Sequence, residues 1–475
     1  MKKITVQDII KVTKGELITG DEKLICKNFS KDSRKIEQGD TYIGIKGEKF
    51  DGSHFWKQAL ENGADCVIVE KIDFKPKEIQ YCESENKTVI KVENTLEALY
   101  EIAKLKRSLY NIPVIAITGS VGKTSTKDIV ANVVSQKYKT LKTIGNNNNN
   151  IGLPFTILRL KEHEAMVLEM GMNHFGEISL LTSIAKPDLC IITNIGTSHI
   201  GNLGSRENIL KAKLEILEGA KNPKVIINND NDLLNEWYNK NSTKYNVTTY
   251  GIKNESDFNA KDITLNQDGS EFSCNIKGKK VDVKVPVGGE HFVLNSLCAI
   301  AVGNYLDIET SKIIKGIEGF ELTKKRMDIK ELTNGVKIIN DAYNASFESM
   351  KATLKYLSDF NKNRKIAVLG DMFELGEFSK ELHEKVGSEI VKNNIDILIC
   401  NGENSKYIAS KAKKEGMEEE KIYYLENKEQ ILKLLKDIAK KGDIILFKAS
   451  NGMKFFELAN SVEEESFWDK SNNGL

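Results

Sequence analysis

The amino-acid sequence predicts an α/β protein of three domains. The chain has 475 residues, a length that suits about three domains of ordinary size. Short apolar runs alternate with helical patterns along most of the chain, as in parallel sheets that are covered by helices. A glycine-rich turn, Gly119–Thr124, stands between one such run and the next helical pattern. Together these three observations predict the fold class.

Residues 1 to 90 predict a small mixed α/β N-terminal domain. We expect short strands at Thr41–Ile45, Cys66–Val69 and Val89–Val92, and one helix at His54–Asn62. Two loops, Asp32–Arg34 and Asp51–His54, carry donor-rich side chains that suit an anionic substrate. The ordinary polarity of exposed loops is the alternative explanation for both.

Residues 91 to 323 predict a central domain with a parallel sheet and a phosphate loop. A helix at Leu96–Tyr110 leads to Val114–Ile117, which has the length and β-branched content of a buried strand, and a helical pattern resumes at Lys127. The turn between them contains Gly119, Ser120, Val121, Gly122, Lys123, Thr124 and Ser125. Glycines let backbone N–H groups surround phosphates, and the following helix presents its positive end. The segment therefore predicts binding of a nucleoside triphosphate by a central P-loop ATPase domain.

Two side chains of this turn have expected roles. Lys123 can reach the β- and γ-phosphate oxygens, and Thr124 is placed to give its hydroxyl to Mg²⁺. The standard phosphate loop has a glycine where this chain has Ile117, so the loop is a shorter Gly-x-x-Gly-Lys-Thr form. A chance glycine turn is the alternative, and the strand–loop–helix context disfavours it.

Further strands of the central sheet are expected at Ala165–Leu168, Leu189–Asn194 and Val225–Asn228. Glu169 ends the first of these strands, at the edge where parallel sheets bind ligands, and can hold Mg²⁺ there. A solvated acid at a strand end is the alternative. His199 follows the second strand and is a weaker candidate, because a lone histidine is more often structural than a ligand.

Lys213 lies in a helical pattern at 207–220. Ile209, Ala212 and Ile216 form an apolar stripe, and Lys213 points with it, whereas Lys211 is expected to pair outward with Glu215. A lysine on an apolar face has a lowered pKa and can react as the free amine with CO₂, giving a carbamate ligand for a second Mg²⁺. The alternative is a lysine whose head reaches out to solvent, and periodicity alone favours it.

The rest of the central domain changes character. Thr248–Val285 has short polar-alternating segments and glycines, which predict an antiparallel patch. Gly289–Asn295 opens a helix that continues through Ala299. Asn295 can hydrogen-bond an adenine edge, and a buried structural asparagine is an equal alternative.

Residues 324 to 475 predict a C-terminal Rossmann-like domain. Its strands are expected at Val336–Asn340, Lys365–Leu369, Ile395–Cys400 and Asp443–Phe447, each followed by a turn and a helical pattern. Arg326 and Asp341 lie at the entry to this domain, where they can clamp a nucleotide when the domains close.

Composition limits the class of protein. Lys and Arg number 69 and Asp and Glu 68, so charge gives no reason to expect a nucleic acid or an anionic membrane as partner. No apolar run is long enough to span a membrane, and the N-terminus lacks the apolar core of a signal peptide. The seven cysteines are scattered without Cys-x-x-Cys spacing, which favours reduced core residues of a cytoplasmic protein.

These residues resemble the Mur ligase family through all three zones. In the first zone the similarity lies in Asp32-Ser33-Arg34, Lys46-Gly47 and Asp51-Gly52…His54. In the second it lies in Thr118–Ser125, Gly145-Asn146…Asn149, Ile151–Pro154, Glu169–Gly171, Asn194…His199, Ala212–Ile216, Gly289…His291…Asn295 and Arg326. In the third it lies in Asp341–Ala345 and Leu369–Gly376, which are most particular to the dipeptide-adding member of the family.

The resemblance implies an activity. It implies an ATP-dependent ligase that adds D-Ala-D-Ala to UDP-MurNAc-tripeptide through an acyl phosphate, with two Mg²⁺ ions, and we expect a monomer. It places a carbamylated lysine at Lys213, which reverses the inference from periodicity. It implies that the metal ligands are Thr124, Glu169, His199 and Lys213. It implies that the catalytic residues are Lys123, Glu169, His199 and Lys213.

The resemblance also implies binding residues. Nucleotide binding falls to residues 119–125 with His291, Asn295, Arg326 and Asp341. Substrate binding falls to Ser33, Arg34, Lys46, Gly47, Asp51, His54, Asn146, Asn149, Tyr343 and Asn344.

Three positions depart from the family pattern. Ser346-Phe347 stands where Asn-Pro is usual, Asn451 replaces an arginine, and Asn150 replaces an acid. The first two lie in the domain expected to receive the dipeptide, so the identity of the incoming amine stays open. Alternatives are a different D,D-dipeptide, another ligase such as a folylpolyglutamate synthase, or a nucleotide-gated binding protein without turnover.

Overall fold

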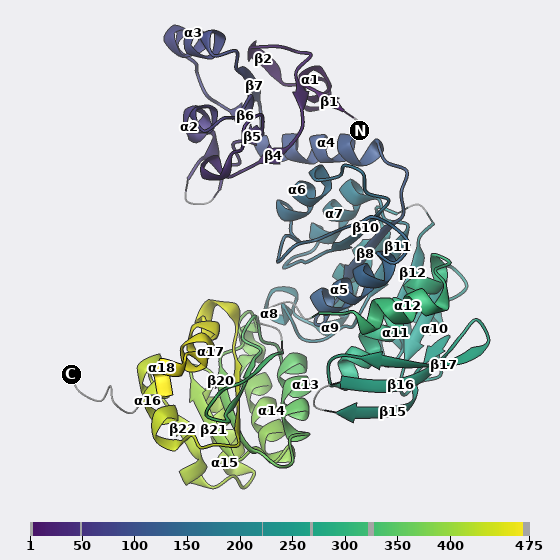
Figure 1. Ribbon diagram of the computed structural model, residues 1–475, viewed down its shortest axis with the longest axis vertical. Helices are drawn as coiled ribbons and strands as arrows, with labels where there is room; N and C mark the ends of the chain where they lie inside the picture. The colour runs from purple at the N-terminus through teal and green to yellow at the C-terminus, as the bar shows by residue number, and fades with distance from the viewer. Residues whose placement is uncertain (1–2, 48–49, 221, 267–268, 322–326, 469–475) are drawn as a thin grey trace. The chain divides into compact units, whose positions relative to one another are not determined.

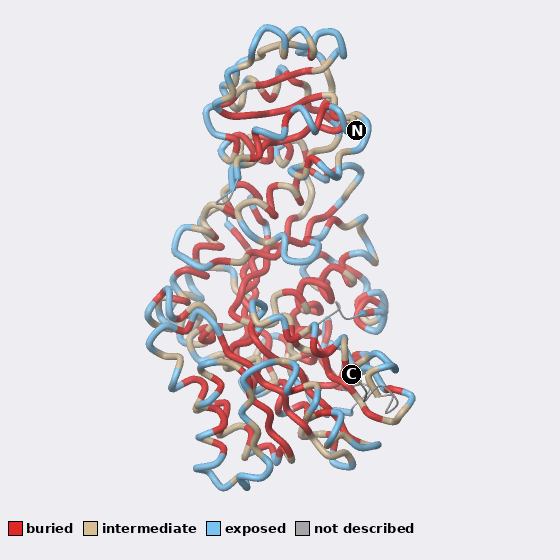
Figure 2. Tube along the Cα trace, turned by 90° about the vertical axis from the view of Figure 1, so that its left-hand side faces the viewer, coloured by how far each residue is buried: buried red, intermediate tan, exposed pale blue. Residues whose placement is uncertain are grey.

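The computed structural model describes residues 3–47, 50–220, 222–266, 269–321 and 327–468. It confirms the predicted α/β class, with a mixed N-terminal domain, a central domain around a largely parallel sheet and a Rossmann-like C-terminal domain (Figure 1). Buried residues follow the strands of each sheet and the helix faces that pack on them (Figure 2). Among the described residues, no helix is long and apolar enough to cross a membrane.

The N-terminal domain has a five-stranded sheet in the order β2-β7-β6-β5-β4. Its strands are β2 (Glu16–Thr19), β4 (Phe29–Ser30), β5 (Thr41–Ile43), β6 (Cys66–Glu70) and β7 (Thr88–Val92), and β1 (Ile4–Thr5) pairs separately with β3 (Ile25–Cys26). Only β2 runs antiparallel to its neighbour. The helices are α1 (Val6–Thr13), α2 (Trp56–Glu61) and α3 (Pro76–Ser84). The apolar runs correctly identified three of the strands, β5, β6 and β7. Trp56, Val67 and Val69 belong to the core of this domain.

The central sheet has seven strands in the order β14-β13-β12-β11-β8-β10-β9. They are β8 (Val114–Thr118), β9 (Thr140–Lys142), β10 (Ala165–Glu169), β11 (Leu189–Ile192), β12 (Lys224–Asn228), β13 (Asn246–Gly251) and β14 (Phe258–Asn259). Every residue of β8 and β10 is buried, which explains why these strands are continuous apolar runs. The helices are α4 (Thr95–Ser108), α5 (Lys123–Val134), α6 (Gly152–Leu158), α7 (Glu177–Ala185), α8 (Ile200–Leu203), α9 (Arg206–Leu214), α10 (Asp232–Asn241), α11 (Glu290–Tyr305) and α12 (Thr310–Glu318).

Two predictions for the central domain need correction. The helix of the phosphate loop begins at Lys123 and not at Lys127, because the loop itself supplies its first turn. Only part of Thr248–Val285 is antiparallel: β15 (Lys261–Asn266), β16 (Gly269–Ile276) and β17 (Lys279–Val285) form a three-stranded antiparallel sheet. The beginning of that segment lies in β13, which runs parallel to β14 in the central sheet.

The C-terminal domain has a six-stranded sheet in the order β18-β19-β23-β20-β21-β22. The strands are β18 (Asp328–Glu331), β19 (Lys337–Asn340), β20 (Arg364–Gly370), β21 (Ile397–Asn401), β22 (Ile422–Tyr424) and β23 (Asp443–Lys448), and only β18 is antiparallel to its neighbour. The helices are α13 (Phe347–Ser358), α14 (Ser379–Lys392), α15 (Lys406–Lys414), α16 (Lys428–Ile438), α17 (Phe455–Glu463) and α18 (Glu465–Trp468). The edge strand β18 is mainly polar and exposed, and the edge strand β22 has only three residues, which are half-buried or exposed, so neither was found as an apolar run.

Candidate active site

The phosphate loop follows β8 in the predicted strand–loop–helix order. Gly119 and Gly122 have φ values of +152° and +79°, which favour glycine. A Cβ atom on Gly119 would lie 1.9 Å from the Thr193 hydroxyl oxygen, so a side chain has no room there. No side chain caps α5 at Gly122, and the first N–H groups of the helix therefore face the loop. This geometry suits a bound phosphate.

A second loop, residues 193–199 after β11, holds the phosphate loop from one side. The Val121 N–H donates to Asn194 Oδ1 (3.0 Å), and Asn194 Nδ2 donates to the Val121 carbonyl (2.9 Å). The Gly196 N–H donates to Ser120 Oγ (2.9 Å), and the Ser198 hydroxyl donates to the Ser120 carbonyl (3.2 Å). The phosphate loop is thus preformed by contacts that the sequence pattern did not indicate.

Lys123 and Thr124 occupy the first positions of α5. Lys123 Nζ donates to the carbonyl oxygens of Gly119 (2.7 Å) and Ser120 (3.4 Å), so its ammonium lies over the loop. Thr124 is buried, and Ser125 is half-buried. Contact of Lys123 with phosphate oxygens stays a prediction.

Glu169 is the last residue of β10, and its register partner is Ile117, the second-to-last residue of β8. Its side chain is buried, and its Oε1 accepts a hydrogen bond from Asn148 Nδ2 (2.7 Å). Asn148 was not among the predicted site residues, because a run of asparagines does not show which member points inward. The predicted Asn149 instead accepts from the Gly152 N–H (2.8 Å) at the start of α6, and Asn146 is exposed.

Lys213 is 1% exposed on α9, among the buried residues Ile209, Ala212 and Ile216. Burial lowers the pKa of its ammonium well below the usual value, and the charge of Lys123 lowers it further. The side chain does not reach solvent, so the alternative favoured by periodicity alone is wrong.

The expected outward pair of Lys211 and Glu215 is also wrong. Glu215 is buried, and its carboxylate accepts from the N–H groups of Gly176 (2.8 Å) and Ser179 (3.2 Å) at the start of α7. The positive end of that helix attracts the carboxylate, which removes it from Lys211.

His199 precedes α8 with a φ of +65°, and its Nδ1 is paired with a carboxylate oxygen of Glu374. The two groups are not aligned as a hydrogen bond. Glu374 belongs to the C-terminal domain and lies in the segment 369–376 that the sequence singled out. Metal ligation by His199 stays a prediction.

The residues predicted for the adenine side lie on α11 and after β19. Asn295 is buried, and its Oδ1 accepts from the Thr126 hydroxyl (2.9 Å), which links α11 to the phosphate-loop helix. Asp341 accepts from Lys448 Nζ (2.5 Å) and from the Thr353 hydroxyl (2.7 Å). The predicted Arg326 lies outside the described residues.

His291 gives a test in solution. Burial lowers the pKa of its imidazole from 6.5 to about 4, with Asp341 opposing this shift and the charge of Lys448 adding to it. The folded protein therefore binds fewer protons than the unfolded chain between these values. We expect the free energy of unfolding to fall as pH decreases from about 6.5 to about 4, by at most about 3 kcal/mol from this group.

Denaturant titrations at several pH values in that window measure the effect. His291→Gln is expected to have a shallower dependence of unfolding free energy on pH than the wild type. Equal slopes for the two proteins would contradict a half-buried imidazole that stays neutral in this pH range.

The predicted substrate residues of the N-terminal domain lie on two loops. Arg34 is exposed and binds Asp32 through two nitrogens (2.8 and 2.9 Å), which lowers the pKa of that carboxyl to about 2. Ser33 is buried and donates to Gln58 (2.7 Å). Asp51 Oδ1 accepts from the Ser53 N–H (2.9 Å) and its backbone bridges to Lys46. Lys46, Gly47 and His54 are exposed.

Three loops of the C-terminal domain meet at the carboxyl ends of β19, β23 and β20, which are neighbours in the sheet. Asn451 Nδ2 donates to the Tyr343 carbonyl (2.9 Å), and Lys448 Nζ donates to the Asn344 carbonyl (3.2 Å). Asp371 is buried and accepts from the Ser405 N–H (2.7 Å) before α15. Tyr343 is half-buried and Asn344 exposed, so this edge offers polar groups to a ligand.

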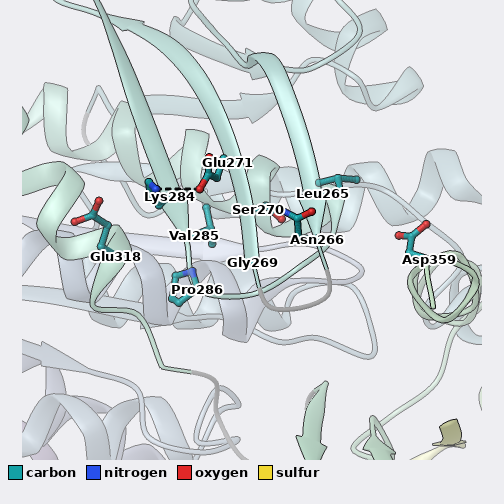
Figure 3. A pocket seen from close by; sticks show the side chains of 10 residues that line it. All are labelled: Leu265, Asn266, Gly269, Ser270, Glu271, Lys284, Val285, Pro286, Glu318 and Asp359. Atoms are coloured by element: carbon teal, nitrogen blue, oxygen red, sulfur yellow. Dashed lines mark ion pairs between the residues drawn. The ribbon is translucent and has the colours of Figure 1, made fainter. Parts of the chain in front are cut away.

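A separate groove lies at one end of the antiparallel sheet, where Lys284 pairs with Glu271 (3.0 Å) (Figure 3). Glu318 and Asp359 stand on opposite sides of it. None of the predicted site residues lines this groove. We therefore keep the strand-end loops, and not this groove, as the candidate site.

The central domain has a preformed phosphate loop at the end of a strand of its sheet, and the Rossmann-like C-terminal domain has polar loops at its own strand ends. This combination is typical of a nucleotide-binding enzyme of the multidomain α/β class. Models of three Mur ligase domains match the chain: the "Mur ligase family, catalytic domain" at 27–107, the "Mur ligase middle domain" at 117–303 and the "Mur ligase, glutamate ligase domain" at 325–451. The chain belongs to the Mur ligase family and is an ATP-dependent ligase.

Relatives match nearly the whole chain. A UDP-N-acetylmuramoyl-tripeptide–D-alanyl-D-alanine ligase from Bacillus subtilis is 39% identical over 468 residues, which are 98% of this chain and 99% of the relative. A crystal structure of MurF from Acinetobacter baumannii has a TM-score of 0.87 at 28% identity and covers 98% of this chain and 100% of that chain. MurF ligase from Thermotoga maritima in complex with ADP has a TM-score of 0.79 at 30% identity, with 92% and 97% covered.

Proposed function

We propose that this chain adds D-Ala-D-Ala to UDP-MurNAc-tripeptide in peptidoglycan precursor synthesis, with ATP converted to ADP and phosphate. The substrate assignment rests on the similarity, over nearly all of both chains, to the UDP-N-acetylmuramoyl-tripeptide–D-alanyl-D-alanine ligase from Bacillus subtilis. The preformed phosphate loop and the buried Lys213 support the ligase chemistry. A different D,D-dipeptide is the second candidate, because Asn451 stands where the family has an arginine.

The reaction has two steps. An oxygen of the tripeptide's terminal carboxylate attacks the γ-phosphorus of ATP, the bond to the bridging oxygen breaks, and ADP leaves. The amine nitrogen of the dipeptide then attacks the acyl carbon, loses a proton, and the tetrahedral intermediate releases phosphate. Lys123 and the N–H groups at the start of α5 neutralise charge on the transferred phosphoryl group, which is the main need of such a transfer.

The donor set of the site fits Mg²⁺. Carboxylate and hydroxyl oxygens are the ligands that this ion prefers, and Glu169 and Thr124 supply them. The neutral amine of Lys213 can attack CO₂ through nitrogen and release a proton, which leaves an anionic carbamate oxygen as a further ligand. We therefore propose two Mg²⁺ ions on Thr124, Glu169, carbamylated Lys213 and His199. Bound Mg²⁺ would neutralise phosphate charge.

The remaining binding roles follow the loops. The N-terminal loops of Ser33, Arg34, Lys46, Gly47, Asp51 and His54 would hold the uridine nucleotide, with Asn146 and Asn149 on the substrate side of the central domain. Residues 119–125 with His291, Asn295, Arg326 and Asp341 would hold ATP, and Tyr343 and Asn344 the incoming amine. We keep domain boundaries of 1–90, 91–323 and 324–475 as part of this proposal. We also propose a cytoplasmic monomer; the seven buried free thiols support the cytoplasmic location.

A ligation assay tests the proposal. Purified protein is incubated with ATP and a panel of UDP-MurNAc-peptides and D,D-dipeptides, and amide product and ADP are both measured. We expect equal amounts of amide and ADP with a UDP-MurNAc-tripeptide and a D,D-dipeptide, and little ADP when either is left out. ADP release that ignores both substrates, or ligation only of glutamate to a folate, would contradict the proposal.

Asn451 offers a test of the amine site. Its amide group is bonded to the Tyr343 carbonyl and lacks the forked cation that clamps a carboxylate. We expect weak affinity for D-Ala-D-Ala, or a preference shifted toward D-Ala-D-Ser. Asn451→Arg should lower KM for D-Ala-D-Ala more than tenfold if the new contact is worth about 1.4 kcal/mol or more.

The KM values for ATP and for the UDP-substrate serve as internal controls and are expected to stay unchanged. An unchanged KM for D-Ala-D-Ala in the variant, together with a wild-type preference for D-Ala-D-Ala over D-Ala-D-Ser, would place residue 451 outside the site.

A further inference from the structure

The loop at 193–199 has a second side, which contacts the C-terminal domain. The Thr197 hydroxyl donates to Glu348 Oε2 (3.0 Å), and Glu348 lies in the first turn of α13. Gly196, next to Thr197, makes room for this carboxylate: a Cβ atom there would lie 2.5 Å from Glu348 Cδ. Thr197 is 7% exposed and Glu348 is half-buried, so the hydrogen bond is partly shielded from solvent.

A backbone contact accompanies it. The Gly201 N–H donates to the Glu374 carbonyl (3.0 Å). A Cβ atom on Gly201 would lie 2.6 Å from the Gly376 nitrogen, so the two chains approach closely. One segment of the C-terminal domain thus contacts the 193–199 loop, which also holds Ser120 and Val121, and a second segment contacts α8 directly after that loop.

The simplest alternative is that Glu348 serves only its own helix, because acids are favourable in a first helical turn. Ser346 already caps α13, and its hydroxyl oxygen accepts from the Ser349 N–H (3.4 Å). The Glu348 carboxylate extends to a residue 151 positions away in the sequence, at a place where a glycine leaves space for it. A helix-dipole role requires neither feature.

We propose that Glu348 is a positioning residue that couples the C-terminal domain to the phosphate loop through Thr197. The path is short: Glu348 holds Thr197, Gly196 donates to Ser120 Oγ (2.9 Å), and Ser198 donates to the Ser120 carbonyl (3.2 Å). Loss of the Glu348 contact loosens the loop that shapes the phosphate site, so nucleotide affinity depends on a side chain of another domain. This inference rests on the nucleotide role proposed for the phosphate loop.

The test is a double-mutant cycle read out as ADP affinity by calorimetry on the full chain. Glu348→Ala and Thr197→Val should each raise the Kd for ADP by roughly five- to twentyfold, in the lower part of the usual range of coupling between sites. The double variant should be no worse than either single one, because both remove the same contact. Glu348→Gln, which still offers an oxygen to Thr197, should recover most of the affinity.

Glu429 provides a matched control. It is an exposed acid in the first turn of α16 and so shares any helix-dipole effect. Glu429→Ala should leave the Kd for ADP unchanged even if it lowers the melting temperature as Glu348→Ala does. If Glu348→Ala does not fold, the Thr197→Val and Glu348→Gln variants carry the test.

The coupling would be overturned if Thr197→Val and Glu348→Ala both bind ADP as tightly as the wild type. It would also be overturned if the increase in Kd of the double variant equals the product of the two single increases. Full turnover in Lys123→Ala would instead show that the phosphate-loop assignment itself is wrong. The two failures are therefore distinguishable.

Discussion

Replacing Lys213 by alanine is expected to reduce ligation by about 10²–10³-fold or more, as loss of a key electrostatic group in an active site does. The residue is 1% exposed, and both burial and the charge of Lys123 favour its neutral amine. That amine is the form that combines with CO₂. Alanine removes the nitrogen and with it the proposed carbamate oxygen.

Added short-chain carboxylic acids should restore part of this activity, because a small carboxylate can occupy the vacated space and supply the missing oxygen. The measurement is kcat for amide formation across a series from formate to butyrate. Lys211→Ala is the matched control, since Lys211 is exposed on the same helix and should behave as wild type.

Normal activity in Lys213→Ala would contradict the assignment. So would a folded variant that no carboxylic acid restores, since that result would leave Lys213 a packing residue and not a source of a ligand.

Lys123→Ala is the second change with a large expected effect. Its ammonium lies over the phosphate loop, bonded to the Gly119 carbonyl (2.7 Å), and it would meet charge that builds on the transferred phosphoryl group. We expect a loss of at least about 10²-fold in kcat/KM for ATP with the fold intact. Thermal unfolding tests whether the variant is folded. Comparable kcat/KM values for ATP in wild type and variant would show that the phosphate-loop assignment is wrong.

The parts of the site that could be predicted depend on local patterns. The phosphate loop was recognisable because a glycine turn between a buried strand and a helix is contained in about a dozen consecutive residues. The inward direction of Lys213 followed from helical periodicity with Ile209 and Ile216, although periodicity could not show that its head group stays buried. The resemblance to the Mur ligases was needed for its role.

The parts that could not be predicted depend on contacts between distant segments. Asn148 reaches Glu169 across the sheet edge, and nothing in the asparagine run distinguishes it from Asn149. Glu215 was expected to pair with a lysine four residues before it, but its carboxylate accepts hydrogen bonds from N–H groups at the positive end of α7. The contact of Thr197 with Glu348 joins two domains, so no local pattern carries it.

The most direct test of the proposed chemistry follows one oxygen atom. UDP-MurNAc-tripeptide labelled with ¹⁸O in its terminal carboxylate is incubated with the purified protein, unlabelled ATP and the D,D-dipeptide, and the released phosphate is examined by mass spectrometry. An acyl phosphate formed at this site predicts one labelled oxygen in the phosphate for each amide bond made. Unlabelled phosphate, released alongside amide product, would contradict it.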